Sequence, residues 1–216
     1  MKKFAVIISG CGVFDGAEIH ETVLTLLAID RQGGSYQLFA PDVEQHHVIN
    51  HLTGQVTAER RNVLVESARI ARGKIRSLNE MDPVHFDGLI LPGGFGAAKN
   101  LCTWAFEGDR CRVNPDVEKA VRSMFALKKP IGAMCIAPVI LARILSGTKL
   151  TTGKDRNSGD FIEKCGSAYV STSHGEVVTD EEKRIFSTPC YMLDSTITQI
   201  AQGADNLVRE MMKRML

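Results

Sequence analysis

The stretch Pro130–Pro138, which reads Pro-Ile-Gly-Ala-Met-Cys-Ile-Ala-Pro, constrains the fold of this chain more than any other. Its apolar, strand-type residues end abruptly at Cys135, and a helical pattern begins at once. A strand, a sharp turn carrying a reactive residue, and a helix form a nucleophile elbow, in which small neighbours such as Ala133 and Ala137 leave room for the bend. A thiol at such a turn would face a helix N-terminus, which favours the thiolate. The alternative is that Cys135 is a buried apolar cysteine.

Alternating strand and helix patterns place this elbow in an α/β fold. Residues 4–9 form a continuous apolar run that is typical of a strand buried on both faces. A helix over 18–31 and a strand over 36–40 follow, and this order predicts a right-handed parallel crossover. The chain, residues 1–216, is predicted to form one domain with a doubly wound, mostly parallel sheet sandwiched by helices. Further strands are expected at 86–91, 131–134 and 149–152, a small hairpin at 176–179 and 185–188, and helices at 61–72, 97–101, 115–128, 136–147, 160–165 and from 194 onward.

Composition and charge exclude several function classes. The net charge is +1 and no basic cluster is interleaved with aromatic residues, so we expect neither a nucleic-acid partner nor an anionic membrane surface. No apolar run approaches the roughly 20 residues that a membrane span requires. The first residues lead directly into a strand and do not resemble a targeting segment. Six cysteines are widely spaced, so we expect reduced thiols and a cytoplasmic location.

Residues 42–60 are polar and long for a connection between elements. They are either a functional excursion or an irregular surface segment. The adjacent His46 and His47 could ligate a metal only with help from elsewhere, and no Cys/His cluster has the spacing of a zinc site. We therefore expect no metal and no cofactor.

Three features follow directly after predicted parallel strands: the loop at 16–21, the glycine group Pro92–Gly96, and Cys135. The carboxyl ends of parallel strands lie at one edge of a sheet, where ligands bind, so these features can meet. The glycine spacing does not match a dinucleotide fingerprint. Its bare backbone N–H groups suit an anion or oxyanion, and the alternative is a simple tight turn.

At these positions the sequence closely resembles a known family over nearly its whole length. The resemblance is to the ElbB family, isoprenoid biosynthesis proteins with an amidotransferase-like domain. That family belongs to the class I glutamine amidotransferase-like superfamily, in the branch of the PfpI proteases and the Parkinson-associated deglycase, and implies a flavodoxin-like fold. The matching segments are Ile8–Val13, Asp15–Glu21, Val48–Gly54, Arg61–Leu64, Pro92–Leu101, Met134–Pro138 and Thr188–Leu193.

The resemblance implies roles for residues in three of these segments. Cys135 matches the elbow cysteine, and Glu21 matches the glutamate that hydrogen-bonds it in the deglycase branch. Gly94 and Ile136 match the positions whose backbone N–H groups form the oxyanion site, with Gly93 beside them. A homodimer is also implied.

Two further polar residues border these motifs. His20 adjoins Glu21, but adjacent helical residues point about 100° apart, so it either borders the pocket or serves packing or dimer contacts. Asn100, at the end of the glycine segment, is a second candidate for the pocket. One departure from the relatives matters: they carry a histidine on the segment at 150–154, which here reads Leu-Thr-Thr-Gly-Lys. The base of a Cys-His-Glu triad is missing.

These observations favour a cofactor-independent, glyoxalase-type lyase. The Cys135 thiolate would add to a small α-oxoaldehyde such as glyoxal, and a protonated Glu21 would move a proton through an enediol to give glycolate. The same chemistry on amine adducts would amount to deglycation. The alternative is a non-enzymatic redox-sensing or small-molecule-binding protein, connected to isoprenoid biosynthesis through the family name. A Cys hydrolase or protease is the third hypothesis, and Gly153 disfavours it.

Overall fold

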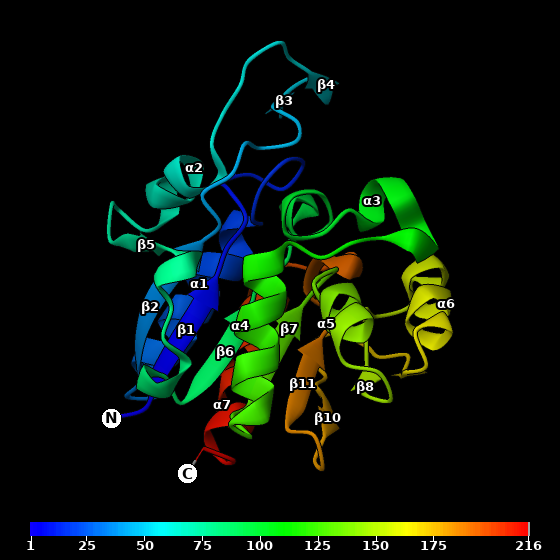
Figure 1. Ribbon diagram of the computed structural model, residues 1–216. Coiled ribbons are helices and arrows are strands. Elements are labelled where there is room, and N and C mark those ends of the chain that lie inside the picture. The colour runs from blue at the N-terminus through cyan, green and yellow to red at the C-terminus, as the bar shows by residue number, and fades with distance from the viewer. Residues whose placement is uncertain (216) are drawn as a thin grey trace.

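A seven-stranded, mostly parallel sheet organises the computed structural model, which describes residues 1–215 (Figure 1). Its strands are β1 (Lys3–Ile7), β2 (Ser35–Ala40), β5 (Ile75–Ser77), β6 (Gly88–Leu91), β7 (Ile131–Met134), β10 (Val178–Asp180) and β11 (Ile185–Thr188). They lie in the order β10-β11-β7-β6-β1-β2-β5, and β10 runs antiparallel to β11. The predicted doubly wound sheet and its small hairpin are confirmed.

Helices cover both faces of this sheet. The α-helices are α1 (Ile19–Arg31), α2 (Val63–Ile70), α3 (Trp104–Glu107), α4 (Pro115–Ala126), α5 (Pro138–Ile144), α6 (Arg156–Lys164) and α7 (Ile197–Met212). Short helical turns are η1 (Leu78–Glu80), η2 (Pro83–His85), the π-helical η3 (Ala97–Leu101), η4 (Gly108–Arg110) and η5 (Cys190–Met192). Helix α1 packs against α7, and α4 packs against α5 on the near side of the sheet in Figure 1. None of the helices in residues 1–215 is both long and apolar enough to cross a bilayer.

The centre of the sheet is buried on both faces, as its apolar strands predict. All four residues of β6, β7 and β11 are buried. Gly132 in β7 admits helix α7 at close range, because an added Cβ would lie 2.6 Å from the sulfur of Met211. This tight packing fixes β7, and with it the elbow that follows.

Several elements differ from the sequence-based expectation. Strand β5 was not predicted, because its three residues are too short and polar to show a strand pattern. The strand expected at 149–152 is β8 (Lys149–Leu150), which pairs with β9 (Ala168–Tyr169) in a separate small sheet. Helix α6 begins before the expected residue 160, because Asp155 caps it by accepting from the Ser158 N–H at 2.8 Å.

The segment at 42–60 contains a small antiparallel hairpin of β3 (Ile49–Asn50) and β4 (Gln55–Val56). It projects beyond the end of the sheet, on the same side as α3 (Figure 1). The Ile49 N–H donates to Asp15 Oδ2 at 2.6 Å, so the hairpin is tied to the loop after β1. The excursion is therefore anchored beside the carboxyl ends of the strands.

The strand order reverses at β1, which lies between β6 and β2. In open α/β sheets, ligands bind in the crevice outside the carboxyl ends of the strands at such a switch point. The loops that leave β1, β6 and β7 meet at this end of the molecule.

Candidate active site

Cys135 occupies the sharp turn between β7 and α5. Its backbone has φ +58°, a left-handed conformation that costs a residue with a side chain on the order of 1–3 kcal/mol. Its N–H donates to the Thr188 carbonyl at 3.0 Å, which holds the turn against β11. Only 8% of Cys135 is exposed. The strand, strained turn and helix match the elbow that the sequence predicts.

Two backbone N–H groups and one carboxyl surround the Cys135 sulfur. The N–H groups of Gly94 and Ile136 hydrogen-bond it and lower the pKa of the thiol. Burial has the larger effect and raises that pKa well above its usual value, and the negative charge of Glu21 raises it further. This direction is opposite to the expected helix-stabilised thiolate, because the expectation took no account of desolvation.

Glu21 is fully buried in the first turn of α1. Its Oε2 accepts from the Gly93 N–H at 3.0 Å, and its Oε1 accepts from the Tyr191 N–H at 3.1 Å. Burial, followed by the charge of Glu18, raises the pKa of the Glu21 carboxyl to about 7, although the hydrogen bonds it accepts lower it. Glu21 can therefore hold a proton at neutral pH.

Cys135 and Glu21 form one titrating pair. The two side chains hydrogen-bond each other. This contact lowers the pKa of Glu21 and raises the pKa of Cys135. Two buried anions in contact repel, so at neutral pH the pair retains a proton. Gly93 allows this contact: an added Cβ would meet the Cys135 Cβ and would lie 2.5 Å from Glu21 Oε2 and 2.9 Å from the sulfur. No side chain can replace the hydrogen of Gly93 without displacing the pair.

Cys135 lines a cavity of about 310 Å³, which is mostly apolar. Gly94, Ile136 and Glu18 contribute to its wall. Residues that the sequence reasoning did not single out complete it, including Trp104, Asp155, Asn157 and Tyr191. Among the described residues, its charged lining groups are the carboxyls of Glu18 and Asp155, and this composition disfavours an anionic group inside this cavity.

Some of these missed residues had a signal in the sequence. Tyr191 follows β11 as Cys135 follows β7, so its place at a strand's carboxyl end could have been inferred. Asp155 and Asn157 come directly after the segment at 150–154, where a histidine was expected. Trp104 gave no signal, because only the fold brings α3 to the cavity.

His20 and Asn100 do not line this cavity. His20 is half exposed, and its Nδ1 lies 2.9 Å from the Tyr191 hydroxyl. Asn100 donates from Nδ2 to the Ser9 and Asp15 carbonyls, each at 2.9 Å, and so ties two loops together.

The adjacent histidines at 46 and 47 pack against an aromatic ring. The ring centroid of His46 lies 3.9 Å from that of Phe106, and that of His47 lies 5.5 Å from it. Within residues 1–215, no three His, Cys, Asp or Glu side chains are grouped so that they could hold a metal ion.

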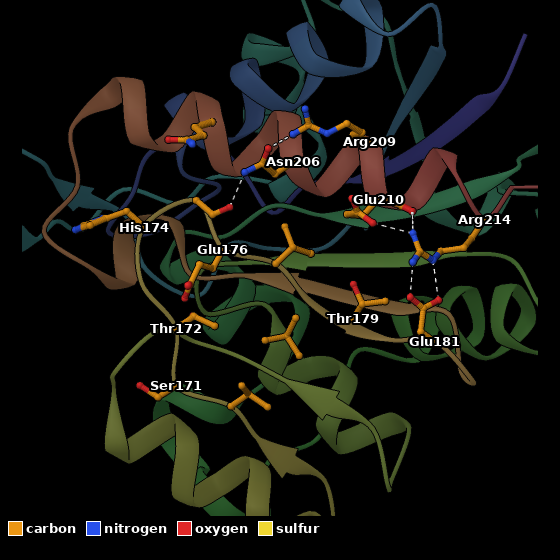
Figure 2. A pocket seen from close by; sticks show the side chains of 15 residues that line it. Ser171, Thr172, His174, Glu176, Thr179, Glu181, Asn206, Arg209, Glu210 and Arg214 are labelled. Carbon is orange, nitrogen blue, oxygen red and sulfur yellow. Dashed lines mark hydrogen bonds and ion pairs between the residues drawn. The ribbon is translucent and has the colours of Figure 1, made fainter.

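A larger cavity of about 880 Å³ lies elsewhere, between α7 and the hairpin strand β10 (Figure 2). Its two arginines are paired: Arg214 binds both Glu181 and Glu210 (Figure 2), and Arg209 pairs with Asp205 and contacts Asn206. No cysteine lines it, and its strongest charges are already neutralised. We therefore place the candidate active site at Cys135.

Comparisons with known proteins agree with this fold. Residues 12–188 match the model of the DJ-1/PfpI family. The chain is 41% identical to the human glutamine amidotransferase-like class 1 domain-containing protein 3, mitochondrial, over 98% of this chain and 82% of that protein. It is 32% identical to the zebrafish ES1 protein, mitochondrial, over 98% and 85%. A shorter match, 33% identical over 35% of this chain and 40% of the relative, is to the deglycase PfpI of Pyrococcus furiosus.

These relatives correct the expected cytoplasmic location, which is wrong. The human and zebrafish proteins are mitochondrial by name. The expectation rested on unpaired cysteines and on the first residues of the chain. Reduced thiols do not identify the cytoplasm, because they are found in more than one compartment.

Solved structures show the same architecture. The isoprenoid biosynthesis protein with amidotransferase-like domain from Ehrlichia chaffeensis has a TM-score of 0.91 and 36% identity, over 98% of this chain and 99% of that one. Glyoxalase III from Candida albicans shares the fold with a TM-score of 0.65 and 14% identity, over 100% and 98%. The chain belongs to the DJ-1/PfpI family, within the class I glutamine amidotransferase-like superfamily.

Proposed function

We propose that this protein is an ElbB-type member of the family that converts glyoxal to glycolate without a cofactor, with Cys135 as nucleophile and Glu21 as proton carrier. One observation carries the proposal: the buried Cys135 and Glu21 side chains hydrogen-bond each other at the wall of a cavity, with the Gly94 and Ile136 N–H groups directed at the sulfur. These groups are a nucleophile, an acid–base and an oxyanion site within one contact distance.

The first step is addition. In the reactive form, the proton of the pair resides on Glu21. After burial, the negative charge of Glu21 is the strongest influence against ionisation of the thiol, and protonation of Glu21 removes this charge. The thiolate forms a C–S bond to one carbonyl carbon of glyoxal, and the C=O electron pair becomes an alkoxide. The N–H groups of Gly94 and Ile136 stabilise this oxygen, and Glu21 then protonates it to give a hemithioacetal.

The remaining steps move one proton and add water. The Glu21 carboxylate removes the hydrogen from the sulfur-bearing carbon as a proton. The C–H electron pair forms the C=C bond of an enediolate, and the second carbonyl oxygen takes up the negative charge. The proton returns to the neighbouring carbon, while the hydroxyl proton shifts between the oxygens, giving a glycolyl thioester on Cys135. Water cleaves the C–S bond, which releases glycolate and restores the thiol. No electron acceptor is needed, because one carbon is oxidised as the other is reduced.

A redox-sensing role has less support from the structure. Sensor cysteines have low pKa values and are accessible to the oxidant. Burial raises the pKa of Cys135, and little of the residue is exposed. Mild peroxide followed by peptide mass spectrometry tests this alternative: selective oxidation of Cys135 would favour it, and even oxidation of all cysteines would not.

The test of the proposed function is glycolate formation from glyoxal by purified protein. Cys135→Ala and Glu21→Gln should each lower the rate at least about 100-fold, because each removes a group that acts in the reaction. Cys165→Ala, at a half-buried cysteine outside the cavity, is the matched control and should retain the wild-type rate. Full turnover by Cys135→Ala would refute the proposal.

We also propose that the chain acts as one domain and forms a homodimer, as the family resemblance implies. Light scattering should then give a mass about twice the 23.7 kDa of one chain. A single chain mass at micromolar concentration would contradict the dimer.

A further inference from the structure

A second hollow lies beside the Cys135 cavity. It also has a volume of about 310 Å³, and three of its lining residues are the aromatic Phe14, Phe95 and Phe106. Between 37% and 49% of each of these residues is exposed, which is unusual for three phenylalanines gathered at one place. Phe95 also lines the Cys135 cavity, so the two spaces adjoin across one ring.

The same three segments build the wall between the two spaces. Val13 and Trp104 line the Cys135 cavity. The residue that follows each of them, Phe14 or Ala105, lines the second one. Phe95 stands between them, and its N–H donates to the Val13 carbonyl at 2.8 Å. A ligand bound at Cys135 would reach the second space by extending around the Phe95 ring.

The excursion at 42–60 supplies the outer wall. Ile49 and Gly54, from the hairpin of β3 and β4, line the second space. His51 stacks on Phe14 with ring centroids 5.0 Å apart, and its Nε2 accepts from the Phe14 N–H at 3.2 Å. Together with the bond from Ile49 to Asp15, these contacts give the excursion a fixed position over the site.

One cation stands in this apolar wall. Lys99 is the charged residue that lines the second space among the residues described. Its Nζ donates to the Phe14 carbonyl at 2.8 Å and lies 5.4 Å from the centre of the Phe95 ring. Desolvation lowers the pKa of Lys99, so its ammonium is poorly hydrated. The Asp15 carboxylate accepts from the Ile49 N–H at 2.6 Å. In the part of the chain that the structure describes, no carboxylate lies within ion-pair distance of Lys99, so its ammonium can pair with an anion.

Glyoxal fills little of the Cys135 cavity. The cavity volume of about 310 Å³ equals that of about ten water molecules at roughly 30 Å³ each, and the second hollow beside it has the same volume. We propose that the second hollow binds the distal part of the substrate, and that the substrate is an α-oxoaldehyde with an apolar or aromatic body and an anionic end. The aldehyde lies at Cys135, the body passes Phe95, and the anion pairs with Lys99. This inference rests on the proposed function.

The test compares glyoxal, phenylglyoxal and 4-carboxyphenylglyoxal by kcat/KM. Lys99→Gln should lower the preference for 4-carboxyphenylglyoxal over phenylglyoxal about three- to tenfold, because only the carboxylate pairs with the ammonium. Phe106→Ala should lower the preference for phenylglyoxal over glyoxal by a similar factor, through lost apolar contact. Lys119→Gln, an exposed lysine on α4, is the matched control and should change neither ratio. Ratios that are the same in all four proteins would overturn the inference.

Failure of the proposed function is separately visible. In that case no aldehyde is consumed in a Cys135-dependent way, and binding decides the inference. Calorimetry with 4-phenylbutyrate, which has an apolar body and an anionic end but no aldehyde, should show binding to the wild type that weakens several-fold in Lys99→Gln. Absence of binding, or equal binding by both proteins, would overturn the inference whatever the outcome for turnover.

Discussion

Glu21 shows how far single residues determine the chemistry of this site. Both of its carboxyl oxygens accept backbone N–H groups, and its side chain has no contact with solvent. Strand positions predicted that the loops carrying Glu21 and Cys135 lie at one edge of the sheet, and the family resemblance implied a hydrogen bond between the two side chains. It did not indicate the direction of the thiol's pKa, because desolvation depends on how completely the surrounding loops close over the sulfur.

The raised pKa of Glu21 has a consequence for stability. Because native Glu21 holds a proton up to about pH 7 and the unfolded chain loses it near 4.5, the folded state binds more protons in between. Stability should therefore fall by about 2 to 3 kcal/mol between pH 5 and 8 from this group alone. Urea unfolding of Glu21→Gln should lack this part of the slope. The exposed-site variant Glu163→Gln should keep it, and equal slopes in all three proteins would contradict the assignment.

Gly93 allows a second test at the same scale. In Gly93→Ala the methyl group has no room between Glu21 and Cys135, so we expect a loss of about 1–3 kcal/mol and disruption of the pair. In Gly73→Ala, where φ is +77° and an added methyl meets nothing, only backbone strain should appear. Thermal unfolding measures the loss of stability in each variant, and glyoxal turnover measures the disruption of the Cys135–Glu21 pair. Normal turnover by Gly93→Ala would refute the close contact.

At the scale of elements, long periodic or punctuated segments could be predicted and short ones could not. The helix expected from residue 115 begins there as α4, where Asn114 caps it and Pro115 occupies its first turn, and the apolar run at 131–134 correctly marked β7. Strands β5 and β9 were missed, since two or three residues carry no period, and the pairing of β8 with β9 in a separate sheet was not foreseen.

The start of α7 offers a prediction about an element. Thr196 accepts from the Gln199 N–H at 3.3 Å, and Gln199 Oε1 accepts from the Thr196 N–H at 2.8 Å, which together form a capping box. Thr196→Ala should destabilise the protein by about 1 kcal/mol. Ser171→Ala, at an exposed position, should have an effect below about 0.5 kcal/mol in the same denaturant titration. Equal effects would contradict the role of the cap.

At the scale of the whole molecule, the sheet decides which sequence features become neighbours. The doubly wound topology correctly predicted that the loops after β1, β6 and β7 meet. It could not predict which cavity the excursion at 42–60 would line, because this depends on the hydrogen bond to Asp15 and on the stacking of His51 on Phe14. The placement of two cavities on either side of Phe95 is thus a property of the fold and not of any motif.

Burial across the fold predicts which thiols react. Cys102, Cys111 and Cys190 are buried in the native protein, and Cys11 and Cys165 are partly exposed. Iodoacetamide should therefore modify the latter two first, and the three buried thiols only after unfolding in urea. Peptide mass spectrometry over a time course determines the order in which the cysteines are modified. Modification of Cys102 as fast as Cys11 in the native state would contradict this packing.

The central claim is that Cys135 and Glu21 share a proton, so that a large fraction of Glu21 is still protonated at neutral pH. The most direct measurement is a carbon NMR titration of protein labelled at the glutamate carboxyl carbons, with the Glu21 signal identified by its absence in Glu21→Gln. The account predicts a titration midpoint near pH 7 for this signal, because burial and the charge of Glu18 oppose its ionisation. A midpoint in the ordinary range of about 4 to 5 would contradict it, since Glu21 would then be an anion without a proton to give.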